Sequence, residues 1–241
     1  MKKNKLPIVY SDDYNIRFFG FQKLHPFDTE KYQKIVSHLK KTLAITDNQL
    51  YEPSKEISNK ELLKVHSKAY LESLENKQNI AQVAEMGLLA KLPLFLLKNK
   101  LLKPIKKAVA GTLLAGELAL KHNWAINLSG GYHHAKRENG EGFCFFADIN
   151  LLIEHLRQKQ LIQSAMIVDL DAHHVPLVIE EIYNLNCNIT ELEEFLLGVE
   201  GNYNGLMGHY FGTPIEELYE NNLIHAIQKN FLQFFKDNNP N

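Results

Sequence analysis

Two apolar segments that each end in a cluster of polar residues constrain the fold of this chain most strongly. Residues 124–128 run into Ser-Gly-Gly-Tyr-His-His at 129–134, and residues 165–168 run into Asp-Leu-Asp-Ala-His-His at 169–174. Both segments have the apolar composition of buried strands, and residues 148–159 between them have the pattern of a helix. A strand, a crossover helix and a second strand form a unit that requires a parallel sheet. The pattern therefore predicts an α/β fold with a mainly parallel sheet.

The two polar clusters fall where open α/β sheets form their ligand-binding crevices, at the carboxyl ends of strands. Residues i and i+2 of an extended segment project to the same side, so Asp171 and His173 are placed to hold one divalent ion. An isolated Asp-x-His sequence is more often a solvated turn than a metal site. Here, however, a second strand end brings His133 and His134 after a glycine-rich turn, and the combination favours a chemical site.

A series of motifs spread over the first 174 residues carries a resemblance to a known family. In order, the motifs are Pro7-Ile8-Val9-Tyr10 with Tyr14, Phe19-Gly20, Leu24-His25-Pro26-Phe27-Asp28 with Lys31-Tyr32, Glu61-Leu62-Leu63, Val65-His66-Ser67 with Tyr70-Leu71, the glycine-histidine run at 130–135, Gly142-Phe143-Cys144, Ala147-Asp148-Ile149 and the run at 169–174. On these residues the chain resembles the zinc-dependent histone deacetylase family, most closely its class IV members and their bacterial relatives. The resemblance implies the arginase/deacetylase fold, a three-layer arrangement in which helices flank a mainly parallel sheet.

The resemblance also implies a reaction. Members of the family hydrolyse the amide of an acylated amine, which here would be acyl-lysine or a related small acylated amine, while a metal ion polarises the carbonyl group and a bound water. Carried over by motif, His133 and His134 are the pair that handles protons. Asp169 would orient His133 through the second ring nitrogen, an arrangement that fixes the tautomer of the imidazole. The implied catalytic residues are therefore His133, His134 and Asp169.

The same resemblance assigns a metal site and a substrate channel. Asp171 and His173 would hold the metal, which is usually zinc in this family. Gly142 and Phe143 would line the narrow channel that admits the acyl-lysine side chain, with the Phe143 ring against the methylene groups of the substrate. Cys144 would help to line the floor of this pocket.

The resemblance ends at His174. The family continues with a glycine-rich loop, whereas residues 175–179 read Val-Pro-Leu-Val-Ile. Residues 175–241 show no recognisable counterpart of the Asp that completes the metal coordination or of the Tyr that hydrogen-bonds the oxyanion. The glycine-bounded segment 208–212 offers His209 and Tyr210 as replacements, although Gly and Asn at such spacings are more often ordinary turns.

The sequence is therefore compatible with two functions. In the first, the chain is an active metal-dependent deacylase whose site is completed by residues of the tail, 175–241, or by a partner chain. In the second, it is a catalytically impaired deacetylase-like protein that uses the pocket as a binding or interaction module. A tightly bound divalent ion in the purified protein would favour the first function, and its absence the second.

Composition and charge restrict the partners. The 241 residues are 45% hydrophobic with a formal net charge of −1, which predicts one domain over 1–241, with 175–241 as a divergent tail packing on it. No basic field for nucleic acid is visible, and the apolar stretch near the N-terminus is too short for a signal peptide or a membrane span. We therefore expect a cytoplasmic protein that binds neither nucleic acid nor membrane. Cys144 and Cys187 are far apart and are expected to be thiols.

Apolar periodicity predicts helices on either side of the sheet. They are expected at residues 28–43, at 62–74 around a turn at 66–67, at 101–121 with Pro104 in the first turn, at 190–197 and at 214–236. In the first of these, Asp28 would be the N-cap, and Ile35, Val36 and Leu39 would form the apolar face. A sheet with fewer strands than the complete family fold would leave an edge that the tail or a second copy in a homo-oligomer must cover.

Overall fold

The computed structural model describes residues 6–17, 20, 28–165 and 167. The chain divides into two compact units, and every described residue except Ile167 belongs to the first. The elements of the described part are β1 (Ile8–Val9), η1 (Asp12–Tyr14), α1 (Lys31–Thr42), η3 (Asp47–Gln49), β2 (Leu50–Tyr51), α2 (Asn59–Leu62), α3 (Lys68–Ser73), α4 (Lys77–Val83), η4 (Gly87–Lys91), α5 (Leu94–Leu97), η5 (Lys98–Leu102), α6 (Lys103–His122), β3 (Ile126–Asn127) and α7 (Asp148–Gln158). Most of the predicted strand 165–168 and both predicted tail helices lie outside the described residues.

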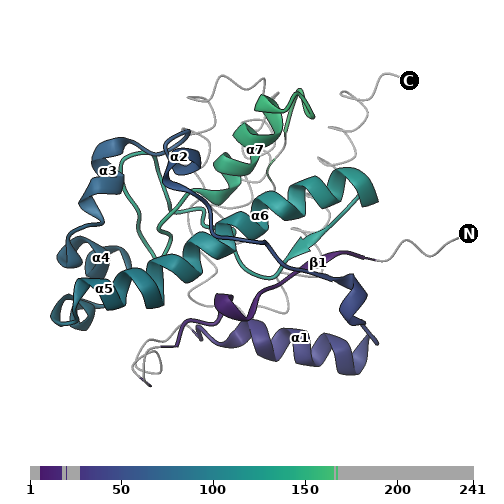
Figure 1. Ribbon diagram of the computed structural model, residues 1–241, viewed down its shortest axis with the longest axis horizontal. Coiled ribbons are helices and arrows are strands. Elements are labelled where there is room, and N and C mark those ends of the chain that lie inside the picture. The colour runs from purple at the N-terminus through teal and green to yellow at the C-terminus, as the bar shows by residue number, and fades with distance from the viewer. Residues whose placement is uncertain (1–5, 18–19, 21–27, 166, 168–241) are drawn as a thin grey trace, which may run out of the picture. The chain divides into compact units, whose positions relative to one another are not determined.

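The three strands form a parallel sheet in the order β2-β1-β3. Ile8 pairs with Leu50 on one side and with Ile126 on the other. Both residues of the central strand β1 are buried, as expected of a parallel strand that is covered on both faces. Figure 1 shows α6 and α7 side by side on one side of β1, with α1 on the other side. The predicted layered α/β fold with a parallel sheet is confirmed.

The long helix α6 packs closely on its neighbours because it carries glycine at two contact positions. A Cβ atom at Gly116 would lie 2.2 Å from Cδ1 of Leu152 in α7, and one at Gly111 would lie 1.9 Å from the hydroxyl oxygen of Tyr14. The helix has Pro104 in its first turn and ends at Asn123, which adopts the left-handed conformation with φ 71°. The prediction of a helix over 101–121 is thus correct to within about two residues at either end.

The main hydrophobic core lies beneath α2 to α7. Its fully buried side chains include Leu62, Ile80, Leu97, Leu101, Phe145 and Phe146. Of the predicted helix 62–74, only residues 68–73 form a helix, α3. Helix α2 ends at Leu62, and the expected turn at 66–67 lies between α2 and α3. The Cys144 thiol is buried in the same core.

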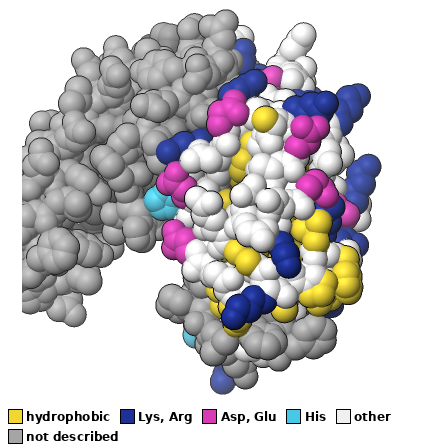
Figure 2. Space-filling view, turned by 90° about the vertical axis from the view of Figure 1, so that its left-hand side faces the viewer, with side chains coloured by type: hydrophobic (Ala, Val, Ile, Leu, Met, Phe, Trp, Pro, Cys, Tyr) yellow, Lys and Arg dark blue, Asp and Glu magenta, His cyan; other side chains and the backbone are white. Residues whose placement is uncertain are grey.

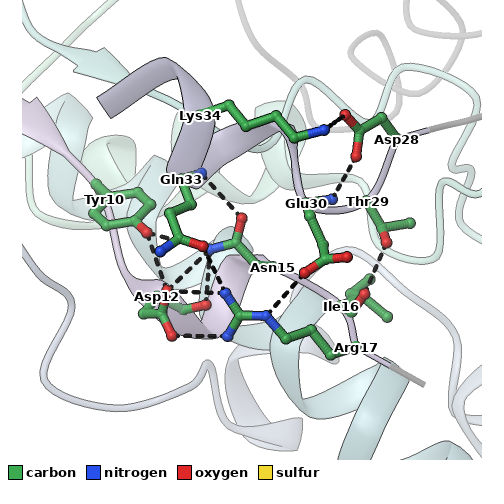
Figure 3. A network of polar contacts seen from close by, with 10 residues as sticks. All are labelled: Tyr10, Asp12, Asn15, Ile16, Arg17, Asp28, Thr29, Glu30, Gln33 and Lys34. Carbon is green, nitrogen blue, oxygen red and sulfur yellow. Dashed lines mark hydrogen bonds and ion pairs between the residues drawn. The ribbon is translucent and has the colours of Figure 1, made fainter. Parts of the chain in front are cut away.

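Helix α1 begins later than predicted, at Lys31. Asp28 is not its N-cap, because the Asp28 carboxylate accepts the backbone N–H of Glu30 at 3.0 Å and thereby closes a turn before the helix. Figure 3 shows instead that the side chain of Asn15 accepts the backbone N–H of Gln33 in the first turn of α1, at 3.0 Å. The predicted apolar face is also narrower than expected, because Ile35 is 38% exposed.

The first predicted strand, 124–128, is shorter and less buried than expected. Only Ile126 and Asn127 pair with β1, and Trp124 is 51% exposed. The left-handed residue Asn123 turns the chain out of α6 immediately before this segment, so its first residues lie at the surface. The segment nevertheless brings residues 129–134 to the carboxyl end of the parallel sheet, as predicted.

Charged side chains of both signs are distributed over the surface of the described part. On the face seen in Figure 2, Lys and Arg side chains are interspersed with Asp and Glu, and that face has no patch of one sign. Among the described helices, none is long and apolar enough to cross a membrane.

Candidate functional site

The predicted catalytic pair, His133 and His134, lies on a tight turn that follows β3. We call residues 129–134 the histidine turn. Gly130 and Gly131 have φ values of 101° and 72°, conformations that few residues other than glycine adopt without strain. The two imidazole rings are adjacent, with centroids 4.2 Å apart and planes inclined by 56°, and both histidines are half-buried. The turn therefore presents two proton-carrying groups next to each other.

The carboxylate of Asp148, the first residue of α7, holds the histidine turn in place. Its Oδ1 accepts the backbone N–H of Tyr132 at 2.8 Å, while Oδ2 accepts the backbone N–H of Gly131 at 2.9 Å and the hydroxyl of Thr112 at 2.6 Å. Asp148 is fully buried, and this burial raises the pKa of its carboxyl group, whereas the hydrogen bonds act in the opposite direction. The side chain thereby ties the turn to α6 and α7.

A chain of buried and partly buried polar groups continues from Asp148 through α6 and β3 to η1. The Thr112 hydroxyl, which donates to Asp148, accepts from Nδ2 of Asn127 at 2.9 Å. Oδ1 of Asn127 in turn accepts the hydroxyl of Tyr14 at 3.1 Å. Each donor in this sequence therefore faces an acceptor, as buried polar groups require. Gly111 makes room for the last contact, because any side chain there would collide with the Tyr14 hydroxyl.

The predicted channel residues Gly142 and Phe143 lie on a second turn near the histidines. A Cβ atom at Gly142 would be only 2.9 Å from Cδ2 of His134, so the His134 ring packs directly over this glycine. Phe143 has φ 66°, and its backbone N–H donates to the carbonyl of Val83 at 2.9 Å, which fixes the turn to the end of α4. The structure thus brings one predicted channel residue into contact range of one predicted catalytic residue.

A third histidine, His66, lies on the turn between α2 and α3, contacts the start of α7 and is fully buried. Its Nε2 accepts the backbone N–H of Ala147 at 3.0 Å, so the neutral ring carries its proton on Nδ1. Burial lowers the pKa of His66 to about 4, against the opposite influence of the backbone carbonyls of Arg137 and Lys136, towards which Nδ1 makes no well-aligned hydrogen bond. The ring is therefore uncharged at neutral pH and serves as a hydrogen-bond acceptor.

The remaining predicted site residues, Asp169, Asp171 and His173, lie outside the described residues. Within the part of the chain that the structure describes, no group of three or more His, Cys, Asp or Glu side chains is arranged to hold a metal. Asp and His are nevertheless donors that suit zinc, so the metal site stays a prediction that rests on the sequence.

Two residues of the site, Asp148 and His66, had no role assigned from the sequence. Both stand in motifs that carry the family resemblance, Ala147-Asp148-Ile149 and Val65-His66-Ser67. The usable signal was the position of Asp148, an acidic residue at the first position of a helix that follows a glycine-rich turn. The pattern gives no indication that Gly131 and Tyr132 return to this carboxylate, because that contact depends on the tertiary fold.

Comparison with known proteins places these features in a family. A model of the histone deacetylase domain matches residues 25–176, well over half of the 241 residues. Histone deacetylase 2 of Arabidopsis thaliana is 43% identical over 170 residues, which cover 70% of this chain and 44% of that protein. The acetoin utilization protein AcuC of Bacillus subtilis is 28% identical over 173 residues, which cover 69% of this chain and 43% of that protein. The chain thus spans about half the length of the curated relatives that it matches.

A solved structure agrees on the fold. The crystal structure of an HDAC homologue complexed with SAHA superimposes with a TM-score of 0.56 at 24% sequence identity, covering 74% of this chain and 48% of that chain. At this identity the likeness shows the fold alone, which is the arginase/deacetylase fold that the motifs predicted. The matched domain, the Arabidopsis relative and this fold agree, and the chain belongs to the histone deacetylase family.

Proposed function

We propose that this chain hydrolyses the amide bond of an acylated lysine or of a related small acylated amine. The observation that carries the proposal is the pair of imidazoles of His133 and His134, held 4.2 Å apart on a turn that a buried carboxylate fixes. Membership of a family whose members are named for deacetylation supports the same reaction. The products would be the free amine and the carboxylic acid.

The histidine pair accounts for the proton transfers that amide hydrolysis requires. One imidazole accepts a proton from the attacking water as the new C–O bond forms, and a protonated imidazole donates to the amine nitrogen as the C–N bond breaks. Two adjacent rings on one rigid turn allow both transfers without movement of the backbone. Asp169, outside the described residues, would orient His133 for the first transfer.

Zinc is part of this proposal through the donor set of Asp171 and His173. When bound, it would polarise the amide carbonyl and the attacking water. Asp171 and His173 follow the predicted strand 165–168, whose carboxyl end would lie at the same sheet edge to which β3 brings the histidine turn. The chain's own residues near the described site would then define the approach of the substrate.

Gly142 and Phe143 would border the path of the acylated side chain. The Phe143 ring is partly buried and packs edge-on against Phe145, with ring centroids 6.1 Å apart. A ring fixed in this way can offer its face to the methylene groups of a lysine. Because Gly142 has no side chain, nothing from that position separates the substrate from the His134 ring.

The test is hydrolysis of a fluorogenic acetyl-lysine peptide by the purified full chain loaded with zinc. We expect a rate at least about a thousandfold below that of a complete family enzyme, because residues 175–241 show no counterpart of the third carboxylate and of the oxyanion tyrosine. Excess zinc should restore the rate only in part, since mass action refills a weak metal site but supplies no missing donor. The signal should disappear in the double variant His133→Ala/His134→Ala. It should persist in His38→Ala, which removes an exposed imidazole from α1.

Equal rates in the wild type and in the double variant would contradict the proposal. A near-normal rate that the double variant abolishes would instead show that the tail completes the site. His209 and Tyr210 are the residues to change next in that case, because they place an imidazole beside a phenol.

A further inference from the structure

We propose that Asp148 is a positioning residue for catalysis, whose carboxylate sets the place of the His133–His134 pair through the backbone of the histidine turn. This inference rests on the proposed function, because it concerns the same two histidines. The hydrogen bonds of the Asp148 carboxylate go to the Thr112 hydroxyl and to the backbone of the histidine turn. It acts on Gly131 and Tyr132, the two residues that immediately precede the pair.

The carboxylate acts as a three-point acceptor. Two of its donors are consecutive backbone N–H groups of the histidine turn, at 2.9 and 2.8 Å, and the third is the Thr112 hydroxyl, at 2.6 Å. Both oxygens are engaged, so the carboxylate group cannot rotate without loss of at least one hydrogen bond. Hydrogen bonds to a charged acceptor are stronger than neutral ones, and here the surroundings exclude water. The position of the turn is thereby linked to the start of α7.

The orientation of the third donor is also determined. The Thr112 hydroxyl has one hydrogen, and its oxygen already accepts from Nδ2 of Asn127, so the hydrogen is available for Oδ2 of Asp148. Asn127 belongs to β3, the strand that leads into the turn. The sheet, α6 and α7 therefore all meet at this carboxylate, and a shift of any one of them is transmitted to the histidines.

The turn fits the carboxylate closely at Gly130. A Cβ atom there would lie 2.5 Å from Oδ2 of Asp148 and 2.5 Å from Oγ1 of Thr112. Residue 130 must therefore be glycine for the carboxylate to reach the N–H groups beyond it. This close fit would be unnecessary if Asp148 served only to begin helix α7, since the start of a helix requires no contact with a turn 16 to 17 residues earlier in the chain.

An amide at position 148 cannot replace the carboxylate. In Asp148→Asn, one side-chain atom becomes an NH₂ group, which has no acceptor capacity. Whichever way the amide is turned, at least one backbone N–H of Gly131 or Tyr132 then faces a donor. The variant retains the size of the side chain and removes a buried charge, so we expect the fold to survive while the turn moves.

The experiment measures amide hydrogen exchange by NMR and steady-state kinetics on the zinc-loaded full chain. In Asp148→Asn, exchange at Gly131 or Tyr132 should become about tenfold to a hundredfold faster, as expected for a lost hydrogen bond to a charged group. The kcat for the acetyl-lysine peptide should fall about tenfold to a hundredfold with KM within about twofold, because the histidines are displaced and the substrate path is not. Thr112→Val, which removes one donor and keeps the shape, should give a smaller change in the same direction.

Glu154→Gln is the matched control, because it makes the same carboxylate-to-amide change on α7, where Glu154 pairs with Arg157. It should leave both measurements unchanged. Unchanged exchange and kcat in Asp148→Asn, or an equal loss of kcat in Glu154→Gln, would overturn the inference. If the wild type shows no hydrolysis above the His133→Ala/His134→Ala background, the proposed function fails. The exchange rates of Gly131 and Tyr132 then decide alone whether Asp148 holds the turn, and unchanged rates overturn this inference as well.

Discussion

In both α1 and α7, the side chain at the N-cap position makes no hydrogen bond to the first turn of the helix. Other residues stabilise the two helix starts, and their surroundings differ. Figure 3 shows the start of α1, where a network of ten residues joins 10–17 to 28–34. Asn15, Ile16 and Thr29 of this network are buried, whereas its ion pairs lie at the surface. In it, Arg17 pairs with Asp12 and Glu30, and the Arg17 and Asp12 side chains are 43% and 64% exposed. At the start of α7, by contrast, His66 and Asp148 are fully buried.

The difference lies in how each start responds to the loss of one partner. At the exposed ion pairs near the start of α1, water can replace a lost partner, and each pair contributes between about 0 and 1 kcal/mol to the free energy of unfolding. At the buried start no water is at hand, so a group that loses its partner bears the full cost of burial, about 1–3 kcal/mol or more when it is charged. A redundant set of exposed ion pairs suits a helix that carries no predicted site residue. A network without spare partners suits the helix that fixes the histidine turn.

The largest effect is expected at the glycine that lets the turn reach Asp148. Gly130→Ala places a methyl group 2.5 Å from two oxygens in a residue with φ 101°, so we expect a loss of about 4 kcal/mol in the free energy of unfolding. Gly131→Ala is the matched comparison, because Gly131 has φ 72° but nothing within 4 Å of its Cβ position. Backbone strain alone should cost about 1–2 kcal/mol there. Urea unfolding of both variants measures the two values, and equal losses would contradict the close fit.

The second prediction concerns the pH dependence of stability that the buried His66 beside α7 should cause. Because the pKa of His66 is lowered from 6.5 to about 4 in the folded chain, the unfolded chain binds more protons between these values. The free energy of unfolding is therefore unaffected by the titration of His66 above pH 6.5, where the ring is neutral in both states. It falls by about 3 kcal/mol in total as the pH decreases from 6.5 towards 4.

Urea unfolding at a series of pH values, in the wild type and in His66→Gln, tests this prediction. The difference between the two curves isolates His66 from other titrating groups, including the carboxyl group of Asp148, whose raised pKa has the opposite effect on stability. The variant should have the flatter curve between pH 6.5 and 4. Parallel curves would mean that His66 is protonated as easily in the folded chain as in the unfolded chain.

The same comparison explains what the sequence could predict. Helices α6 and α7 were located to within about two residues, because their signals are local: apolar periodicity, a proline in the first turn and small residues for close packing. The start of α1 was misplaced, because it depends on Asn15 and on the pairing of Ile16 with Thr29, contacts between segments that are distant in sequence. No local pattern contains that information.

The candidate site divides in the same way. The glycines and the paired histidines predict a turn that carries two imidazole groups. The structure places His133, His134 and Gly142 together. The role of Asp148 was missed, since an acidic residue in the first turn of a helix is ordinary and its partners lie on another element. Asp169, Asp171 and His173 stay predictions from the sequence.

The smallest effect is expected at the exposed ion pairs near the start of α1. Arg17→Gln removes the ion pairs with Asp12 and Glu30, and its cost should be less than about 1 kcal/mol and should disappear in about 1 M salt, since exposed pairs are screened. The comparison variant is Tyr14→Phe, which removes one buried hydroxyl and leaves Oδ1 of Asn127 without this donor. It should cost about 1–2 kcal/mol, with no dependence on salt, because no charge is removed. Urea unfolding at low and high salt measures both. If the loss in Arg17→Gln exceeded that in Tyr14→Phe at high salt, the exposed ion pairs would contribute more to stability than the buried hydrogen bonds. The contrast between the two helix starts would then not hold.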